Sequence, residues 1–437
     1  MQSKTICFGL VLIALTIGLL GVVMSYADNL VQFSDLQYLG AFRLPANQNI
    51  EYGGYTLGYN PGSGSPGSLF IGCLNTAATI AEISIPTPIN SLNLSNLNKA
   101  AILQPCADPT AGTTIGIGSS DPAQVGGMLV YGGKLIVSKY VYYDASKSQT
   151  AAFFVKPNTN LSQANATGAY KVGNAPSIGF LDGWMAPIPS AWQTALKGPV
   201  ASGNCCLSII SRTSWGPDAF SWDPAKLTNV NTTVPSTPLV YYTQQNPTLG
   251  QWDGLTPNNT TTWWNNSGTG YRDGGVIPDG ARSLLVFGSQ GMDPLGFCYG
   301  EGTTNPTLNR QPVPGEPGVI YCYDLVDRYK GTHGYPYQYQ IMAFDLNDLA
   351  SVAAGTKQPY SVLPYAVWPL TSGLIGVDGK SNHTAGGAVY DPTLKRIYFS
   401  TPYTDGQLPL IQVWQVNITG SSADTTPPSP PTAIKVQ

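Results

Sequence analysis

The sequence predicts an all-β protein, a β-propeller of about five four-stranded blades, and three observations lead to this fold. The 437-residue chain is poor in charge, at 10%, and rich in turn and strand formers, with 49 Gly, 36 Pro and 25 Tyr. A hairpin phrase recurs along it. An unpaired strand near the N-terminus matches a strand that is missing from the last repeat. Gly and Pro interrupt helices, whereas Tyr fits pleated sheets.

The repeated phrase has two small residues, an apolar stretch, a turn and a second run of β-formers. Asn-Pro, Gly-Gly, Asp-Gly or Asp-Pro supplies the turn in four copies, which is the pattern of a β-hairpin. The third copy is degenerate, and we place its second strand at 207–210. The five copies span residues 53–71, 126–137, 182–210, 274–287 and 386–399.

A third strand follows every hairpin, and a fourth follows most of them. Four antiparallel strands per repeat make one propeller blade. The predicted third strands are 80–86, 152–157, 219–224, 341–346 and 411–416. The predicted fourth strands are 101–105, 239–242 and 365–369.

The two ends of the chain complete the pattern. The last repeat stops after its third strand, near residue 416, while residues 38–45 form a strand with no hairpin of its own. We expect this N-terminal strand to close the ring as the fourth strand of the last blade, which would protect an exposed sheet edge. A β-sandwich or a solenoid is the alternative, and neither would bring the two ends together. The long fourth repeat has room for a further blade.

The N-terminus has the layout of a secretory signal peptide. Lys4 precedes an apolar run, residues 6–24, and Ser25-Tyr26-Ala27 forms a small-residue exit. An uncleaved anchor is the alternative, because the run is long enough to cross a bilayer. We expect cleavage after residue 27 and no later membrane span. The mature protein is then secreted and lies outside the cell, at its surface or in a periplasm.

The charge balance excludes some partners. With Lys4 removed, 20 basic residues stand against 24 acidic ones, and no block of one sign occurs. Binding to nucleic acid or to an anionic membrane is therefore not expected.

Six cysteines remain after Cys7 leaves with the signal peptide, and an even number in an exported chain indicates disulfides. Six cysteines permit fifteen sets of pairs, and the positions of the cysteines in the predicted fold favour one of these sets. Cys73 and Cys106 fall in loops at the same end of the blades, and Cys298 and Cys322 share one insertion. Cys205 and Cys206 are adjacent and form either a vicinal bridge or two buried thiols. The preferred pairs are 73 with 106, 205 with 206, and 298 with 322.

Strand alternation places a candidate site at one end of the central channel. The loops that enter the inner strands and the loops that join second to third strands emerge on the same face, here called the mouth face. Polar residues come just before the small-residue pairs that open the inner strands, and the glycines let crowded backbones approach closely. They are Glu51, Asp121, Gln124, Asp182, Arg272, Asp273, Asn382 and His383.

Paired carboxylates are the equipment for cleaving a glycosidic bond. At Glu51, Asp182 and Asp273 the arrangement resembles five-bladed glycoside hydrolases, which place acids at the starts of inner strands. The resemblance covers architecture alone, because no sequence motif of those families is present. It implies Glu51, Asp182 and Asp273 as catalytic residues. His383 would suit a proton shuttle. The alternative is that these side chains cap turns, as loop acids commonly do.

Two long insertions reach the mouth face. Residues 244–273 carry Trp252, Trp263, Trp264, Tyr271 and Arg272, and residues 289–338 carry Cys298, Cys322 and His333. Aromatic rings beside amides and hydroxyls suit the stacking and hydrogen bonding of sugars. Packing of the loops on the blades is the alternative explanation. No nucleotide motif or dense metal-ligand cluster occurs, so the cofactor is unknown; no residue spacing supports a structural Ca²⁺ ion among the loop aspartates.

The Pro-rich tail, residues 424–436, resembles the linker and first strand that open bacterial fibronectin type III domains. The expected organisation is a signal peptide at 1–27, a propeller at 28–420 and a linker or truncated module at 421–437. Three functions fit: binding of carbohydrate or another extracellular ligand at the mouth, hydrolysis of a glycan by mouth carboxylates, or a structural or adhesive role at a cell surface.

Overall fold

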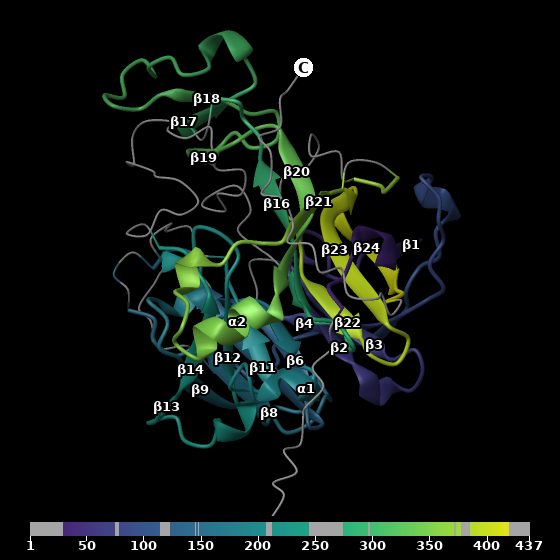
Figure 1. Ribbon diagram of the computed structural model, residues 1–437. Helices are drawn as coiled ribbons and strands as arrows, with labels where there is room; N and C mark the ends of the chain where they lie inside the picture. Colours follow the sequence, from purple (N-terminus) through teal and green to yellow (C-terminus); the bar gives the residue numbers. More distant parts are fainter. Residues whose placement is uncertain are drawn as a thin grey trace, which may run out of the picture.

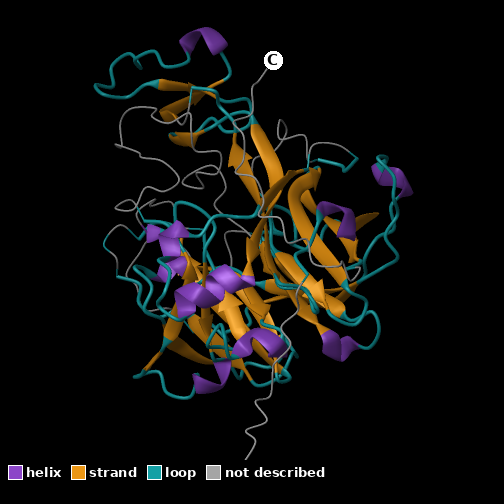
Figure 2. Ribbon diagram, in the orientation of Figure 1, coloured by secondary structure: helices purple, strands orange, loops and turns teal. Residues whose placement is uncertain are grey.

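The computed structural model describes residues 29–74, 78–113, 123–144, 146, 148–206, 212–243, 274–295, 298–370, 373–376 and 385–418. The expected signal peptide and the Pro-rich tail therefore lie outside the described residues. Strands dominate the described part, and its helices are short (Figure 2). No described helix has the length and apolar character that a membrane span requires.

Five sheets of four or five strands make up most of the described chain (Figure 1). Sheet 1 contains β2 (Leu57–Asn60), β3 (Ser68–Gly72), β4 (Ile80–Ser84) and β5 (Ile102–Ala107). Sheet 2 contains β6 (Ala123–Tyr131), β7 (Lys134–Val141), β8 (Phe153–Lys156), β9 (Thr167–Val172) and the parallel β13 (Thr233–Val234). Sheet 3 contains β10 (Met185–Pro187), β11 (Val200–Ser202), β12 (Ala219–Trp222) and β14 (Ser236–Val240).

Sheets 4 and 5 follow the same antiparallel order. Sheet 4 contains β15 (Gly274–Val276), β16 (Ser283–Gly291), β20 (Tyr337–Asp345) and β21 (Ala366–Pro369). Sheet 5 contains β22 (Ala388–Asp391), β23 (Arg396–Asp405), β24 (Leu408–Val416) and β1 (Leu36–Arg43). The α-helices are α1 (Ser190–Gln193) and α2 (Leu346–Ala353). The 3-10 turns are η1 (Phe33–Asp35), η2 (Pro61–Ser63), η3 (Leu94–Asn96), η4 (Ile178–Phe180), η6 (Pro224–Lys226), η7 (Pro306–Leu308) and η8 (Pro359–Ser361).

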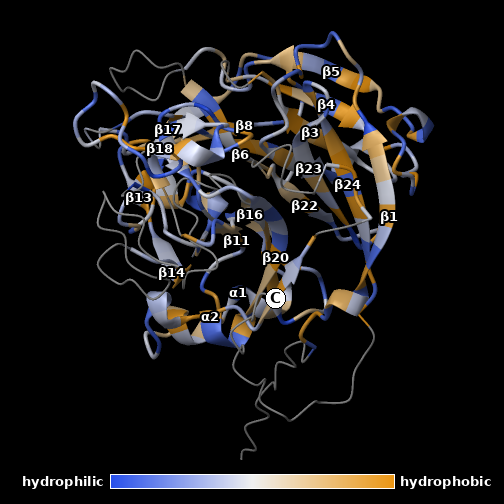
Figure 3. Cartoon of the chain, turned by 90° about the horizontal axis from the view of Figure 1, so that it is seen from above, coloured by the Kyte–Doolittle hydropathy of each residue, from blue (hydrophilic) through white to orange (hydrophobic). Residues whose placement is uncertain are grey.

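The sheets pack around a common centre, each on two neighbours (Figure 3). The first strands meet in cyclic order, since β2 contacts β6, β6 contacts β10, β10 contacts β15, β15 contacts β22, and β22 contacts β2. A separate apolar cluster fills each interface between adjacent sheets, including the one between sheets 5 and 1. This packing is that of a β-propeller.

The glycine pairs explain how the inner strands come so close. A side chain added at Gly127 would overlap the carbonyl oxygen of Gly183, and one added at Gly274 would overlap the backbone of Ala388. Both clashes involve backbone of the next inner strand segment, which cannot move aside. The role expected of the repeated glycines, close approach around the channel, is confirmed at these positions.

The N-terminal strand joins the last sheet, as its sequence predicted. β1 pairs antiparallel with β24, with Leu36 opposite Val416 and Arg43 opposite Leu410. Arg43 also donates two hydrogen bonds to the Asp405 carboxylate, from its Nε at 2.6 Å and from its Nη2 at 2.9 Å. The outer edge of sheet 5 is therefore supplied by residues from the other end of the described chain.

One prediction about the repeat is wrong. The second strand of sheet 3 is β11, residues 200–202, and not residues 207–210, because β11 pairs with both β10 and β12. Residues 207–210 lie outside the described residues. Helix α1 and the prolines around it lengthen the connection after β10, and a strand of three residues has too few positions to show an alternating pattern. Sheet 2 also has a fourth strand, β9, that the repeat did not predict.

The three predicted disulfides are confirmed: Cys73–Cys106, Cys205–Cys206 and Cys298–Cys322. Cys106 lies within strand β5 instead of the loop expected for it. The third bond staples an insertion between β16 and β20, which forms its own small sheet from β17 (Cys298–Thr303), β18 (Tyr321–Tyr323) and β19 (Gly331–His333). This insertion stands above the five sheets in Figure 1.

Candidate functional site

The mouth face is only partly described, and this decides which predicted residues can be placed. Glu51, Gln124 and Asp182 lie within the described ranges. The other predicted site residues lie outside them and stay predictions: Asp121, Trp252, Trp263, Trp264, Tyr271, Arg272, Asp273, Asn382 and His383.

Glu51 lies in the loop that enters β2 and is partly exposed. Its carboxylate accepts a hydrogen bond from the backbone N–H of Asn47, four residues earlier. This contact is the turn-capping role that was the alternative for the mouth acids. Within the described part of the chain, no hydrogen bond links Glu51 to Asp182.

Asp182 lies just before β10 and is fully buried, with 0% of its surface exposed. Burial raises the pKa of its carboxyl well above the ordinary value, because removal from water disfavours the charged form. The Arg212 guanidinium acts in the opposite direction but does not cancel this effect. Gln149 Nε2 donates to Asp182 Oδ2 at 3.4 Å, and Asp182 Oδ1 has no partner among the described residues. Asp182 is therefore an interior acid whose neutral form is favoured by burial, and it is out of reach of a ligand.

A cavity of about 250 Å³ lies between sheets 2 and 3, next to this acid. Three connections form it, namely those between β7 and β8, between β9 and β10, and between β11 and β12. All three emerge where the inner strands begin, which places the cavity on the mouth face. Its lining residues are Gln149, Thr150, Val172, Gly173, Ala175, Pro176, Ser177, Ile178, Leu181 and Arg212.

A buried ion pair forms the polar wall of the cavity. Arg212 Nη1 lies 3.0 Å from Asp144 Oδ2, and both side chains are 2% exposed. Arg212 Nε donates to Ser177 Oγ at 2.9 Å, and its Nη1 also donates to the carbonyl of Asp144. The guanidinium is therefore held from two sides by residues of different loops, and it fixes these loops relative to each other.

Asp144 remains charged in this environment. Burial alone would raise the pKa of its carboxyl, but backbone hydrogen bonds from Gln149 and Ser148, the Ser148 hydroxyl and the charge of Arg212 outweigh it and lower the pKa to about 2. The bond lengths are 3.0 Å from Gln149 N, 3.0 Å from Ser148 N and 2.8 Å from Ser148 Oγ. Asp144 therefore serves as a permanent counter-ion for Arg212.

Gln149 connects the ion pair to the buried acid. Its backbone N–H donates to Asp144, while its side-chain Nε2 donates to the carbonyl of Lys139 at 2.7 Å and to Asp182. Among the described residues, Gln149 Oε1 is a buried acceptor without a donor, like Asp182 Oδ1.

The lining of this cavity is mixed. Arg212, Gln149, Thr150 and Ser177 contribute polar groups, and Val172, Ile178 and Leu181 supply apolar surface. Tyr142 and Tyr143 precede Asp144 on the same loop and are 39% and 57% exposed. Apolar surface with a few convergent polar groups is the usual composition of a small-molecule site.

The residues of this cavity were missed from the sequence. Arg212, Asp144 and Gln149 lie in loops that join second to third strands, which the repeat itself assigns to the mouth face. Charged residues in these loops are the sequence signal that identifies the Arg212–Asp144 pair as a candidate.

A second cavity, of about 240 Å³, lies at the opposite end of the channel. Residues at the ends of all five inner strands line it, and most are apolar, including Met128, Met185, Ile277 and Val389. Its position and composition separate it from the polar mouth face.

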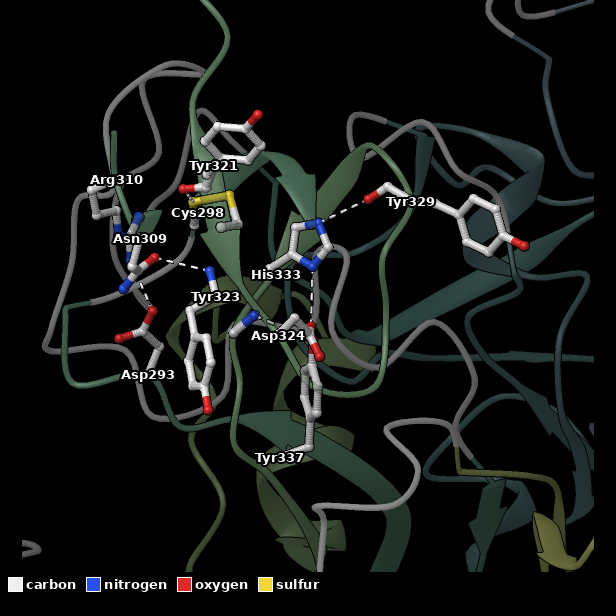
Figure 4. The surroundings of a disulfide bond; sticks show 12 residues. Asp293, Cys298, Asn309, Arg310, Tyr321, Tyr323, Asp324, Tyr329, His333 and Tyr337 are labelled. Carbon is white, nitrogen blue, oxygen red and sulfur yellow. Dashed lines mark hydrogen bonds and ion pairs between the residues drawn. A yellow bond between two sulfur atoms is a disulfide. The ribbon is translucent and has the colours of Figure 1, made fainter. Parts of the chain in front are cut away.

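The insertion after β16 contains a buried histidine beside its disulfide (Figure 4). His333 Nδ1 lies 3.0 Å from Asp324 Oδ2, and its Nε2 lies 3.0 Å from the carbonyl oxygen of Tyr329. His333 is 1% exposed. Its contacts are those of a structural residue that holds the insertion together. In the described ranges, no three His, Cys, Asp or Glu side chains are grouped as metal ligands.

No protein-family model matches this sequence, and no curated protein does. Solved structures show weak similarity. An arabinanase, Arb43A from Bacillus subtilis, has 10% identity, covers 86% of this chain and 96% of its own, and has a TM-score of 0.35. A GH43 endo-arabinanase from Bacillus licheniformis has 9% identity, coverages of 85% and 95%, and a TM-score of 0.37. A luciferin-regenerating enzyme has 9% identity, coverages of 88% and 93%, and a TM-score of 0.33. Functions do not transfer at this level of similarity.

Proposed function

We propose that this chain is a secreted five-bladed β-propeller that binds carbohydrate on its mouth face, in the cavity between sheets 2 and 3. The observation that carries the proposal is a cavity of about 250 Å³ whose wall includes the exposed Thr150 and the half-buried Ser177, with Ser177 held by the buried Arg212–Asp144 ion pair. Fixed donors and acceptors around a partly apolar hollow suit the hydroxyl groups and the apolar face of one sugar residue.

Export is the part of the proposal that rests on the cysteines and the N-terminus. Three disulfides are the kind of crosslink that persists in oxidising compartments. The layout of residues 1–27 supports the same localisation. A glycan outside the cell is therefore the partner that we propose.

Binding is favoured over hydrolysis by the state of the described acids. Hydrolysis needs one carboxyl as acid and another as base or nucleophile, both reaching the glycosidic bond. Asp182 is fully buried, and Asp144 is 4% exposed and paired with Arg212. Hydrolysis would depend on Glu51, Asp273 and His383. An adhesive role would require neither the cavity nor the acids.

The test is a glycan-array and hydrolysis screen of the mature protein, with two matched tryptophan variants. Thr150 is exposed at the rim of the cavity, and Thr228 is exposed at the opposite end of the sheets. We expect Thr150→Trp to abolish binding of the selected glycan, Thr228→Trp to retain it, and no variant to release sugar. Unchanged binding by Thr150→Trp would show that the cavity is not the site. Sugar release that Asp273→Asn abolishes would establish the hydrolase instead.

A further inference from the structure

Three tyrosines form a cluster on the mouth face between sheets 5 and 1. Tyr52 and Tyr55 lie in the loop that enters β2, and Tyr403 lies near the end of β23. The ring centroid of Tyr403 is 6.1 Å from that of Tyr52 and 6.3 Å from that of Tyr55, both in edge-on geometry. The hydroxyls of Tyr55 and Tyr403 are 2.9 Å apart. We call these three residues the tyrosine platform.

Two of the three tyrosines have an unusual backbone conformation. Tyr52 has φ of 62° and Tyr403 has φ of 58°, which is the left-handed region that Gly and Asn normally occupy. Each bulky residue there raises the energy of the folded state. Tyr403 also lies where the pairing of β23 with β24 is irregular, between Thr401 and Asp405. Bulges of this kind commonly redirect a side chain beside a functional site.

Core packing does not account for these tyrosines. Tyr52 is 39% exposed and Tyr403 is 37% exposed, so neither residue belongs to the core. A glycine at either position would adopt the same backbone without strain. The folded chain therefore maintains two costly conformations whose result is a pair of exposed aromatic rings.

Backbone hydrogen bonds and a disulfide tie the loop that carries Tyr52 to neighbouring segments. The backbone N–H of Tyr52 donates to the carbonyl of Gln407 at 2.8 Å, which ties the entry loop to the hairpin that follows Tyr403. Leu74 N donates to Asn49 O at 3.0 Å, and Cys73 beside it is joined to Cys106. Rings that are ordered before binding lose little conformational entropy when a ligand arrives.

We propose that the tyrosine platform is a second sugar-binding subsite, where a ring of a neutral oligosaccharide packs against Tyr52 and Tyr403. Sugar rings present an apolar face edged by hydroxyls, which matches an aromatic ring beside polar groups. Glu51 precedes Tyr52, and its carboxylate has acceptor capacity beyond the one bond from Asn47. This subsite deepens the proposed function and rests on it, because it adds a second contact for the same class of ligand.

Glycine substitutions separate a binding role from a structural one. Tyr403→Gly and Tyr52→Gly remove a ring and also relieve the left-handed backbone. A binding role predicts an unchanged or higher Tm together with an affinity for the selected oligosaccharide weakened about tenfold, as for an exposed aromatic anchor. Tyr403→Phe keeps the ring and should bind within about twofold of the unmodified protein. A lower Tm for both glycine variants with unchanged affinity would overturn the proposal.

The cavity variant distinguishes failure of this inference from failure of the proposed function. If the unmodified protein binds no glycan, both are wrong. If Thr150→Trp abolishes binding and Tyr403→Gly leaves the dissociation constant unchanged, only the platform is wrong. If Tyr403→Gly weakens binding and Thr150→Trp does not, the platform is supported and the cavity is wrong. Isothermal titration calorimetry with the oligosaccharide selected on the array gives each of these outcomes.

Discussion

The insertion between β16 and β20 should lose stability as the pH rises, because it is held by a protonated histidine. Both ring nitrogens of His333 face acceptors, the Asp324 carboxylate and the Tyr329 carbonyl. A neutral imidazole has one N–H, so only the imidazolium can donate to both. Burial would lower the pKa of His333, but the hydrogen bond and the charge of Asp324 outweigh it and raise that pKa.

The pH window follows from the two directions of shift. Burial would raise the pKa of Asp324, yet hydrogen bonds from His333, Tyr337 and two backbone N–H groups outweigh it and lower that pKa. A raised histidine pKa gives stability that is complete below about pH 6.5 and is lost as the pH rises through the folded value. A lowered aspartate pKa gives stability that is complete above about pH 3.9 and is lost as the pH falls through the folded value. The pair therefore stabilises most between these two limits.

His333→Gln is the perturbation, and removal of one partner of a buried ion pair costs about 3–5 kcal/mol. Both residues of the pair are at most 1% exposed, so solvent screening does not reduce this figure. Three hydrogen bonds to Asp324, from Tyr337 and the N–H groups of Val326 and Asp327, survive the change. We therefore expect the lower end, about 3 kcal/mol at pH 6.

Hydrogen exchange of the β17, β18 and β19 amides between pH 5 and pH 9 measures the effect in the insertion itself. The difference in the free energy of opening between His333→Gln and the unmodified protein should be largest near pH 6 and should shrink as the pH rises. The chain has two histidines, so His383→Gln is the matched control and should keep the pH dependence of the insertion. A difference that stays constant across this range would refute the imidazolium assignment.

Three further changes test the fold. The Tm of Asp182→Asn should rise relative to that of the unmodified protein as the pH increases from 4 to 7. Burial raises the pKa of Asp182, so ionisation of this carboxyl opposes folding in the unmodified protein. A Tm difference that stays constant with pH would contradict this. Gly127→Ala should lower the free energy of unfolding by about 1–3 kcal/mol in urea, since the added methyl overlaps the Gly183 carbonyl, and no loss would mean that the strands can separate freely. Serine at both Cys73 and Cys106, whose sequence separation is 33, should cost about 3.8 kcal/mol from loop entropy, and a loss below about 1 kcal/mol would argue against that account.

Local signals were sufficient for most of the fold. Turn residues such as Asn60-Pro61 and Gly132-Gly133 define hairpins whose strands are adjacent in sequence, and the structure pairs them as predicted. The partner of the N-terminal strand was found because the last repeat lacked one strand. The third repeat failed because β11 has three residues and follows a helix, so neither its length nor its pattern marks it as a strand.

The site depended on contacts that no local pattern contains. Arg212 and Asp144 are 68 residues apart, and Tyr55 and Tyr403 are 348 residues apart, yet each pair is in direct contact. Asp182 was correctly placed before an inner strand, but its burial comes from packing between neighbouring sheets.

The sequence by itself determined the all-β class, four of the five hairpins, two of the three disulfide pairs and the closing strand, because these follow from turn residues, spacing and repetition. Only the tertiary structure decided that Asp182 is buried, that Arg212 is fixed at a cavity wall, and that Tyr52 and Tyr403 meet in left-handed conformations. The physical reason is that burial, charge pairing and ring contact are properties of surfaces brought together from distant parts of the chain.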